Sequence, residues 1–513
     1  MRDHGEQGRI AHAKQNILFG YIGQAATAVM SFILRRIFIL HLSTTLLGIN
    51  STYTNILSIL SMAELGIGTA LNFALYAPVA QGDTEKVKAY MQMYRRAYRT
   101  IAIVVAAVGL MFAPFLKYLI KGPEGVTLTQ LTVYYLIFLF NTVSTYLVAY
   151  KYSLVNAEQK NYIQTNIITV TKILTVLCQI AVLVLTESFL MFLLTDALIQ
   201  LVQKIFVSRY LDARYPLLSQ PVTAPLSGEE RAAVWKKTRA LLWHRIGDVL
   251  RLQTDALIIS SMIQVAVAGF VDNYVLVITT VSNFVGIIFN SVISGFGNLI
   301  ATESRERQKE LFQVYRFCAA WIYGFSATGF VVLLSPLIRL WLGDGWVLPQ
   351  TVVLLILADY YFKGDRIVNS NFKTAAGVFE QDKYLAMLQG IVNLVLSILL
   401  VQKIGLAGIY IGTVVSGLIA NVTKPFIIYR TCFDEGPGSY FADSAKYFAT
   451  VCIAVLLCGG ACSLIIREVT IPRFAVSMLV VTVIFNALFA ALFYRRKEFS
   501  YLMGIAAKSV LRR

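Results

Sequence analysis

Long apolar segments separated by short polar ones recur along almost the whole chain, from Ile17 to Tyr494. Each segment has close to the about 20 residues that an α-helix needs to cross the hydrocarbon core of a bilayer. The pattern predicts an all-α polytopic membrane protein with about 14 transmembrane helices. The predicted spans are 16–42, 46–77, 97–120, 131–154, 164–186, 188–208, 239–264, 269–296, 313–338, 347–372, 384–402, 405–430, 446–466 and 473–494.

Basic residues give an independent test of this count. With the N-terminus inside the cell, 32 of the 45 lysines and arginines fall in cytoplasmic tails and loops and six in external connections. Because cytoplasmic loops are enriched in Lys and Arg, both termini are predicted to be cytoplasmic. The net charge of +17 then follows mostly from topology, and membrane lipids, not nucleic acid, are the expected partners of these loops.

A polar connection from Arg209 to Arg239 divides the apolar pattern. It contains Pro216, Pro221 and Pro225, which oppose a continuous helix. The predicted parts are an N-lobe of six spans (1–208), a cytoplasmic linker (209–238), a C-lobe of six spans (239–430), and a C-terminal helix pair with a cytoplasmic tail (431–513). Two such lobes around a central path are typical of transporters built from repeats.

The segment 85–100, before the third span, is rich in both basic and aromatic residues. It places Arg95 and Arg99 near Tyr90 and Tyr94. This composition indicates either a short amphipathic helix at the cytoplasmic interface or a solvated connection between two spans, and both interpretations are open.

Ionisable residues inside spans are the main functional candidates, because they are costly in a bilayer unless they face a cavity or a partner. The seventh span carries His244, Asp248, Arg251 and Asp255, with Arg245 beside them. The first four follow i, i+4, i+7, i+11 and share one helix face. They form either a salt-bridge ladder at a helix contact or the wall of a cavity in which Arg245 or Arg251 binds an anion.

The tenth and first spans carry further charge. Asp359, Lys363 and Arg366 repeat the same helical spacing in the tenth span. Arg35 and Arg36 lie together in the first span. These two arginines either line the same cavity or extend to the outer interface, and both interpretations are open.

Polar faces on two more spans complete the candidate set. The second span places Asn50 and Glu64 on one narrow face, and the eighth does the same with Asn283 and Asn290. Singly, such residues are explained by hydrogen bonding between packed helices. Spans one, two, seven and eight are equivalent positions in the two lobes, which favours a shared central cavity. Its arginines favour a large, amphipathic substrate with a phosphate group.

Several motifs of catalysis are missing from the sequence. It has no phosphate-binding loop and no H-E-x-x-H motif, and its six cysteines lack metal-ligand spacing. The external connections are short, which leaves little room for an external catalytic domain. We therefore predict that the protein is not an enzyme and holds no cofactor or metal.

Sequence motifs indicate a family. They are Leu47-Gly48-Ile49-Asn50, Ala63-Glu64-Leu65-Gly66-Ile67-Gly68-Thr69-Ala70, Leu75-Tyr76 and the segment from His244 to Asp255. With these motifs the chain resembles the bacterial Wzx-type polysaccharide flippases over most of its length. The resemblance implies the fold of the multidrug/oligosaccharidyl-lipid/polysaccharide exporter superfamily, with two six-helix lobes around a central cavity.

The resemblance also implies an activity. The expected substrate is an oligosaccharide linked to undecaprenyl pyrophosphate, moved across the bacterial cell membrane by alternating access alongside other polysaccharide-assembly proteins. The substrate-binding candidates are Arg35, Arg36, Arg245, Arg251, Lys363, Arg366, Asn50, Asn283 and Asn290. The candidates for binding a coupling H⁺ or Na⁺ are Glu64, Asp248, Asp255 and Asp359. The alternatives are an ion-coupled drug or metabolite antiporter of the same superfamily and a membrane polysaccharide polymerase.

Overall fold

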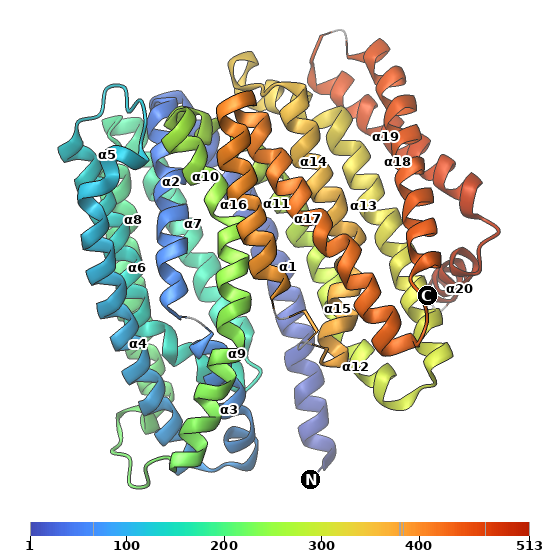
Figure 1. Cartoon of the computed structure of the whole chain (residues 1–513). Helices are drawn as coiled ribbons and strands as arrows, with labels where there is room; N and C mark the ends of the chain where they lie inside the picture. Colours follow the sequence, from blue (N-terminus) through green and yellow to red (C-terminus); the bar gives the residue numbers. More distant parts are fainter. Residues whose placement is uncertain (1, 65, 379–380, 383, 467, 512–513) are drawn as a thin grey trace. The chain divides into compact units, whose positions relative to one another are not determined.

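The computed structural model describes residues 2–64, 66–378, 381–382, 384–466 and 468–511. Within these ranges, some side chains lie outside the description: those of 2–14, 16–17, 62–63, 240–241, 243–245, 248, 252, 294, 301 and 505–511. The described regular structure is helical throughout, with no strand (Figure 1). The predicted all-α class of polytopic membrane protein is confirmed.

The chain divides into two compact units, Met1–Gly269 and Phe270–Arg513. The first contains α1 (Arg2–His41), α2 (Thr44–Leu60), α3 (Ile67–Gln81), α4 (Thr84–Phe112), α5 (Leu116–Leu119), α6 (Leu128–Ala157), α7 (Asn161–Thr186), α8 (Phe189–Arg214), α9 (Gly228–Leu252) and α10 (Thr254–Ile258). Helix α11 (Val265–Ser291) leads from the first unit into the second. There follow α12 (Ile293–Thr302), α13 (Arg305–Leu342), α14 (Gln350–Asp365), α15 (Ile367–Ala376), α16 (Leu385–Ile404), α17 (Leu406–Ile428), α18 (Gly438–Ile465), α19 (Ile471–Phe493) and α20 (Lys497–Leu511).

Among the described residues, 11 segments are long and apolar enough to cross a membrane, and each matches a predicted span. The three remaining predicted spans, 46–77, 239–264 and 347–372, are interrupted helices: α2 and α3, α9 and α10, and α14 and α15. The full count of 14 crossings stays a prediction. The interruptions matter because broken helices within membranes are tolerated where they border protein or a water-filled cavity.

The predicted linker, 209–238, is mostly helical. Helix α8 continues to Arg214 and α9 begins at Gly228, which leaves only 215–227 outside α-helices. The start of α9 is set by a capping box, in which Ser227 and Glu230 each accept a hydrogen bond from the other's backbone N–H. Helices α9 and α10 fall in the first unit, whereas the predicted C-lobe begins at 239.

Each unit has an aromatic core. In the first, Tyr53 and Tyr135 are fully buried with ring centroids 5.5 Å apart, and the Tyr53 hydroxyl donates to Leu131 O at 2.8 Å. In the second, Phe317 of α13 packs against Phe489 of α19 at 5.2 Å. The C-terminal helices α18 and α19 therefore pack on α13 as part of the second unit (Figure 1).

Candidate functional site

The interruption between α2 and α3 holds one of the predicted ion-coupling residues. A short 3₁₀ turn, Ser61–Glu64, follows α2 and ends at that carboxylate. The Tyr98 hydroxyl of α4 donates a hydrogen bond to Glu64 Oε1. The neighbouring Tyr94 hydroxyl donates to the backbone oxygen of Gly68 at 2.9 Å. Two tyrosines of α4 thus donate hydrogen bonds to residues on both sides of the interruption between α2 and α3.

Two glycines make this arrangement possible. Gly66 has φ 79°, in the left-handed region that favours glycine. A Cβ at Gly68 would overlap the Glu64 carboxylate and the Tyr98 hydroxyl. The carboxylate therefore lies against the first turn of α3, where the helix dipole favours a negative charge. The sequence motif around Glu64 encodes a pre-formed carboxylate site.

A second polar cluster lies inside the first unit, between α6, α7 and α8. Asn141 Nδ2 of α6 donates to Asp196 Oδ2 of α8 at 3.0 Å. Lys204, also on α8 and only 7% exposed, donates to Asn141 O at 2.9 Å and to Ser144 Oγ at 2.8 Å. The electrostatic fields of Lys204 and of Lys172 on α7 both act on Asp196.

The sequence analysis singled out none of these residues. A signal was available, because Lys172, Asp196 and Lys204 all fall in the predicted spans 164–186 and 188–208. An ionisable residue within a span is a functional candidate by default. Lys172 lies on α7, and Asp196 and Lys204 lie on α8, so the three do not follow the i, i+4, i+7 spacing of one helix face. They form a polar cluster with Asn141 of α6 only when α6, α7 and α8 pack together.

The interruption between α9 and α10 carries part of the predicted seventh-span site. Helix α9 ends at Leu252 and α10 begins at Thr254, so Arg251 and Asp255 flank the break. Both side chains are half-buried. The side chains of His244, Arg245 and Asp248 lie outside the described residues. The prediction assumed one continuous helix. That helix is interrupted at Gln253, so Asp255 does not follow Arg251 on the same unbroken helix.

The third interrupted helix separates the predicted tenth-span residues. Asp359 and Lys363 form an ion pair at 2.5 Å on α14. Arg366, at the junction of α14 and α15, is 5% exposed, and its Nη1 donates to Gly417 O at 3.0 Å and to Asn421 Oδ1 at 2.7 Å on α17. All three residues have protein partners in this structure. The role of Lys363 and Arg366 in substrate binding and that of Asp359 in ion coupling stay predictions.

The same junction holds a network that the sequence did not indicate. Asp365 Oδ1 accepts a hydrogen bond from Ser444 Oγ of α18 at 2.8 Å. The same Ser444 Oγ accepts one from Arg316 Nη2 of α13 at 2.6 Å. The Arg316 guanidinium also lies 3.5 Å from the ring centroid of Tyr440. Arg316 lies near the start of the predicted span 313–338, where the sequence analysis did not single it out, and it is 4% exposed within α13.

The remaining candidates lie on single helices. Arg35 and Arg36 on α1 and Asn50 on α2 are half-buried in the first unit. Asn283 and Asn290 on α11 are exposed in the second unit. Arg35 and Arg36 each have an interaction partner within the protein.

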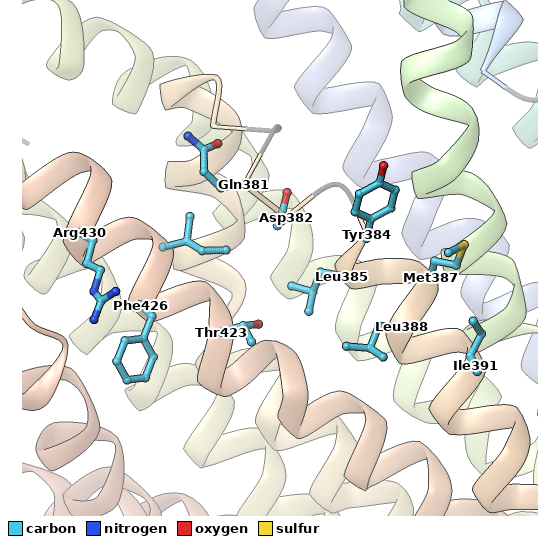
Figure 2. Close-up of a pocket in the computed structure, with 11 residues that line it drawn as sticks. Gln381, Asp382, Tyr384, Leu385, Met387, Leu388, Ile391, Thr423, Phe426 and Arg430 are labelled. Carbon is cyan, nitrogen blue, oxygen red and sulfur yellow. The ribbon is translucent and has the colours of Figure 1, made fainter.

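A groove of about 690 Å³ lies in the second unit between α16 and α17. Figure 2 shows Leu388 and Ile391 of α16 on one side, and Phe426 of α17 and Arg430 of the π-helical turn Tyr429–Phe433 on the other. The Arg430 guanidinium lies 5.8 Å from the centroid of the Phe426 ring. Of the predicted candidates in the described part of this unit, none lines the groove.

Comparisons with known proteins identify the fold. No family model matches the sequence, and no curated protein matches it. Among solved structures, the lipid II flippase MurJ in an inward closed conformation aligns with a TM-score of 0.66, covering 93% of this chain and 99% of that one at 13% identity.

Two transporters are similar as well. A mutant of the MATE transporter VcmN of Vibrio cholerae has a TM-score of 0.59 at 16% identity, covering 84% of this chain and 99% of that one. An inward-facing multidrug resistance MATE family transporter of the MOP superfamily also has a TM-score of 0.59, covering 79% of this chain and 94% of that one at 14% identity. The chain therefore has the fold of this class of membrane flippases and transporters.

Proposed function

We propose that the protein is a flippase for a lipid-linked oligosaccharide, carried on undecaprenyl pyrophosphate, across the cell membrane. The observation that carries this proposal is the likeness to the lipid II flippase, which extends over 93% of the chain, against 84% and 79% for the two MATE transporters. The interrupted helices with charged residues at their breaks add support, because transporters bind substrates and ions at such breaks.

The proposal assigns the pyrophosphate to arginines. Guanidinium groups match phosphate oxygens with two parallel hydrogen bonds, so the candidates are Arg35, Arg36, Arg245, Arg251 and Arg366, with Lys363 as a further cation. The test begins with Arg251, because it lies at the interruption between α9 and α10.

Coupling to H⁺ or Na⁺ is the second part of the proposal. Glu64 is the preferred site, because its carboxylate lies between a tyrosine hydroxyl and the first turn of α3. Binding of a proton or Na⁺ would weaken its hold on Tyr98 and α3, which joins ion binding to the geometry of the α2–α3 interruption. Asp359 is already paired with Lys363 at 2.5 Å.

The test is the sidedness of a labelled undecaprenyl-pyrophosphate oligosaccharide in proteoliposomes containing the purified chain. We expect the lipid on the inner leaflet to become accessible to an external glycosidase with wild-type protein and not with Arg251→Glu. Arg430→Gln, which alters an exposed arginine in the groove of Figure 2, is the matched control and should behave as wild type.

The likeness to the MATE transporters favours one second candidate, an ion-coupled drug antiporter. Proteoliposomes with an imposed proton or sodium gradient and a fluorescent cationic drug distinguish the two. Drug uptake that depends on the gradient, together with unchanged lipid sidedness, would replace the flippase proposal by the antiporter.

A further inference from the structure

A second groove, of about 730 Å³, lies in the first unit beside the part of α4 where the sequence changes from polar to apolar. The N-terminal half of α4 is polar and basic, whereas Ile101 to Phe112 contains no charged residue. The groove is lined on both sides of that change, by Met93, Arg96 and Val104 of α4, Arg231 and Trp235 of α9, and Leu226 before α9. It therefore spans the level at which a membrane-crossing helix passes from the headgroups into the hydrocarbon.

The polar end of the groove is cationic. Arg96 and Arg231 are both exposed, and neither forms an ion pair with any carboxylate that the structure describes. The described lining of the groove contains no carboxylate. Nearby, Glu85 pairs with Lys88 at 2.5 Å and Glu230 pairs with Lys86 at 3.3 Å, while Glu229 is exposed and lies outside the lining. Two guanidinium groups are thus left to attract an anion.

Arg231 is held in place for such a contact. Its Nε and Nη2 donate to the backbone oxygen of Leu226 at 3.2 and 3.0 Å. These two hydrogen bonds fix the side chain, and no described residue accepts a hydrogen bond from Nη1. A phosphate oxygen is the acceptor that such a group prefers.

The other end of the groove is apolar and open. Trp235 is 53% exposed and Val104 is 44% exposed. Val104 lies in the uncharged part of a segment that is long and apolar enough to cross a membrane, which places this end of the groove at the depth of lipid chains. Trp is also a residue that favours the membrane interface, because its ring has an apolar body and a polar N–H.

We propose that this groove is a binding site for an anionic phospholipid, with the phosphate on Arg96 and Arg231 and an acyl chain against Val104 and Trp235. An anionic lipid fits better than a zwitterionic one, because the described lining carries two arginines and no carboxylate that could bind an ammonium group. The site shares no residue with the predicted substrate-binding set and is independent of the proposed flippase activity.

Trp235 supplies the experiment. Purified full-length protein in detergent micelles is titrated with phosphatidylglycerol or phosphatidylcholine carrying brominated acyl chains, which quench tryptophan fluorescence at short range. The difference between wild type and Trp235→Phe isolates the signal of this one residue. We expect half-maximal quenching of Trp235 at a lower mole fraction of phosphatidylglycerol than of phosphatidylcholine.

The arginines decide the interpretation. Each of Arg96→Gln and Arg231→Gln should weaken the apparent affinity for phosphatidylglycerol about fivefold and leave phosphatidylcholine unchanged. Both residues are exposed, so the variants should elute as folded protein on size exclusion. Arg430→Gln, next to Phe426 in the other apolar groove, is the matched control and should retain the preference.

Three results would overturn the assignment. Equal quenching by the two lipids would remove the charge preference. An unchanged preference in the double variant Arg96→Gln, Arg231→Gln would place the lipid elsewhere. Displacement by soluble glycerol phosphate at the same concentration as the lipid would show that a free phosphate, not a membrane lipid, occupies the groove.

Discussion

Arg366 donates a hydrogen bond of 2.7 Å to the side-chain oxygen of Asn421, and this bond ties the junction of α14 and α15 to α17. The Asn421 amide in turn donates to Phe362 O at 2.9 Å and to Asp365 Oδ2 at 3.2 Å. The backbone groups released where α14 ends are thereby given partners from the neighbouring helix. A buried arginine here stabilises an interrupted helix.

Arg366→Ala is expected to destabilise the fold by about 1–3 kcal/mol, because it leaves buried acceptors on α17 without a donor. The measurement is the midpoint of thermal unfolding in detergent. Lys363→Gln is the control: its side chain is 42% exposed, so breaking its pair with Asp359 should cost only about 0–1 kcal/mol. An Arg366→Ala variant that unfolds like wild type but does not transport would instead make Arg366 a substrate-binding residue.

Gly68→Ala is expected to destabilise the first unit by about 1–3 kcal/mol, because the added methyl group overlaps the Glu64 carboxylate and the Tyr98 hydroxyl. Gly20→Ala on α1 is a matched control, since a Cβ there meets nothing within 4 Å. Thermal unfolding of the two variants compares them directly. Equal midpoints would show that the carboxylate site adapts without cost.

Glu64→Gln is expected to abolish the dependence of transport on an imposed ion gradient, because the neutral amide cannot exchange a proton or bind Na⁺ as a carboxylate does. Tyr98→Phe removes the hydroxyl that donates to this carboxylate and should alter the ion dependence without abolishing transport. The readout is the rate of lipid translocation in proteoliposomes with and without the gradient. A Glu64→Gln protein that responds to the gradient as wild type does would move the coupling role to Asp255 or Asp359.

Lys204→Met is expected to destabilise the first unit by about 1–3 kcal/mol, because it removes the buried donor to Asn141 O and Ser144 Oγ. Asp196→Asn tests whether the charge of Lys204 also acts on Asp196, which accepts a hydrogen bond from the same Asn141. A double-mutant cycle of unfolding midpoints measures the coupling between the two residues. Strictly additive effects would show that they do not interact.

The start of α9 should be sensitive to acid. The Ser227 backbone N–H hydrogen bond, together with Lys86, holds the pKa of Glu230 below its usual value of 4.5. A lowered pKa in the folded protein stabilises it above pH 4.5, and that contribution is lost as the pH falls through the folded pKa. The difference in unfolding midpoint between wild type and Glu230→Gln should be present at pH 7 and shrink below about pH 4.5. A difference that persists at pH 3 would contradict this account.

Most of the helices could be predicted from the sequence, because a run of about 20 apolar residues has few alternatives in a membrane protein. The interruptions between α2 and α3, α9 and α10, and α14 and α15 could not be predicted in this way. A stripe at i, i+4, i+7, i+11 assumes 100° per residue along one unbroken helix, and that assumption fails where backbone angles change at Gln253 and Arg366. Arg366 consequently binds α17 and does not continue the face of Asp359 and Lys363.

Glu64 was identified because it is a carboxylate in an apolar span and shares one narrow polar face with Asn50. The role of the glycines beside it became clear only from the structure. Lys204 and Asp196 were equally visible but were not recognised, because their partners come from other helices. Arg316 was not singled out either, because its partners Tyr440 and Ser444 come from α18. Helix α13 itself, with 38 residues, is longer than the predicted span 313–338. The length of a helix beyond the hydrocarbon core leaves no hydrophobic signal.

The bond from Ser444 to Asp365 makes α18 part of the charge balance of the second unit. Without α18, the Arg316 guanidinium would lose Tyr440 and Ser444, and Asp365 would lose two of its hydroxyl donors. Charged groups without partners are costly in a membrane protein. Truncation before α18 would therefore expose two unsatisfied charges in the helices that remain, so the last helix pair is not a dispensable appendage.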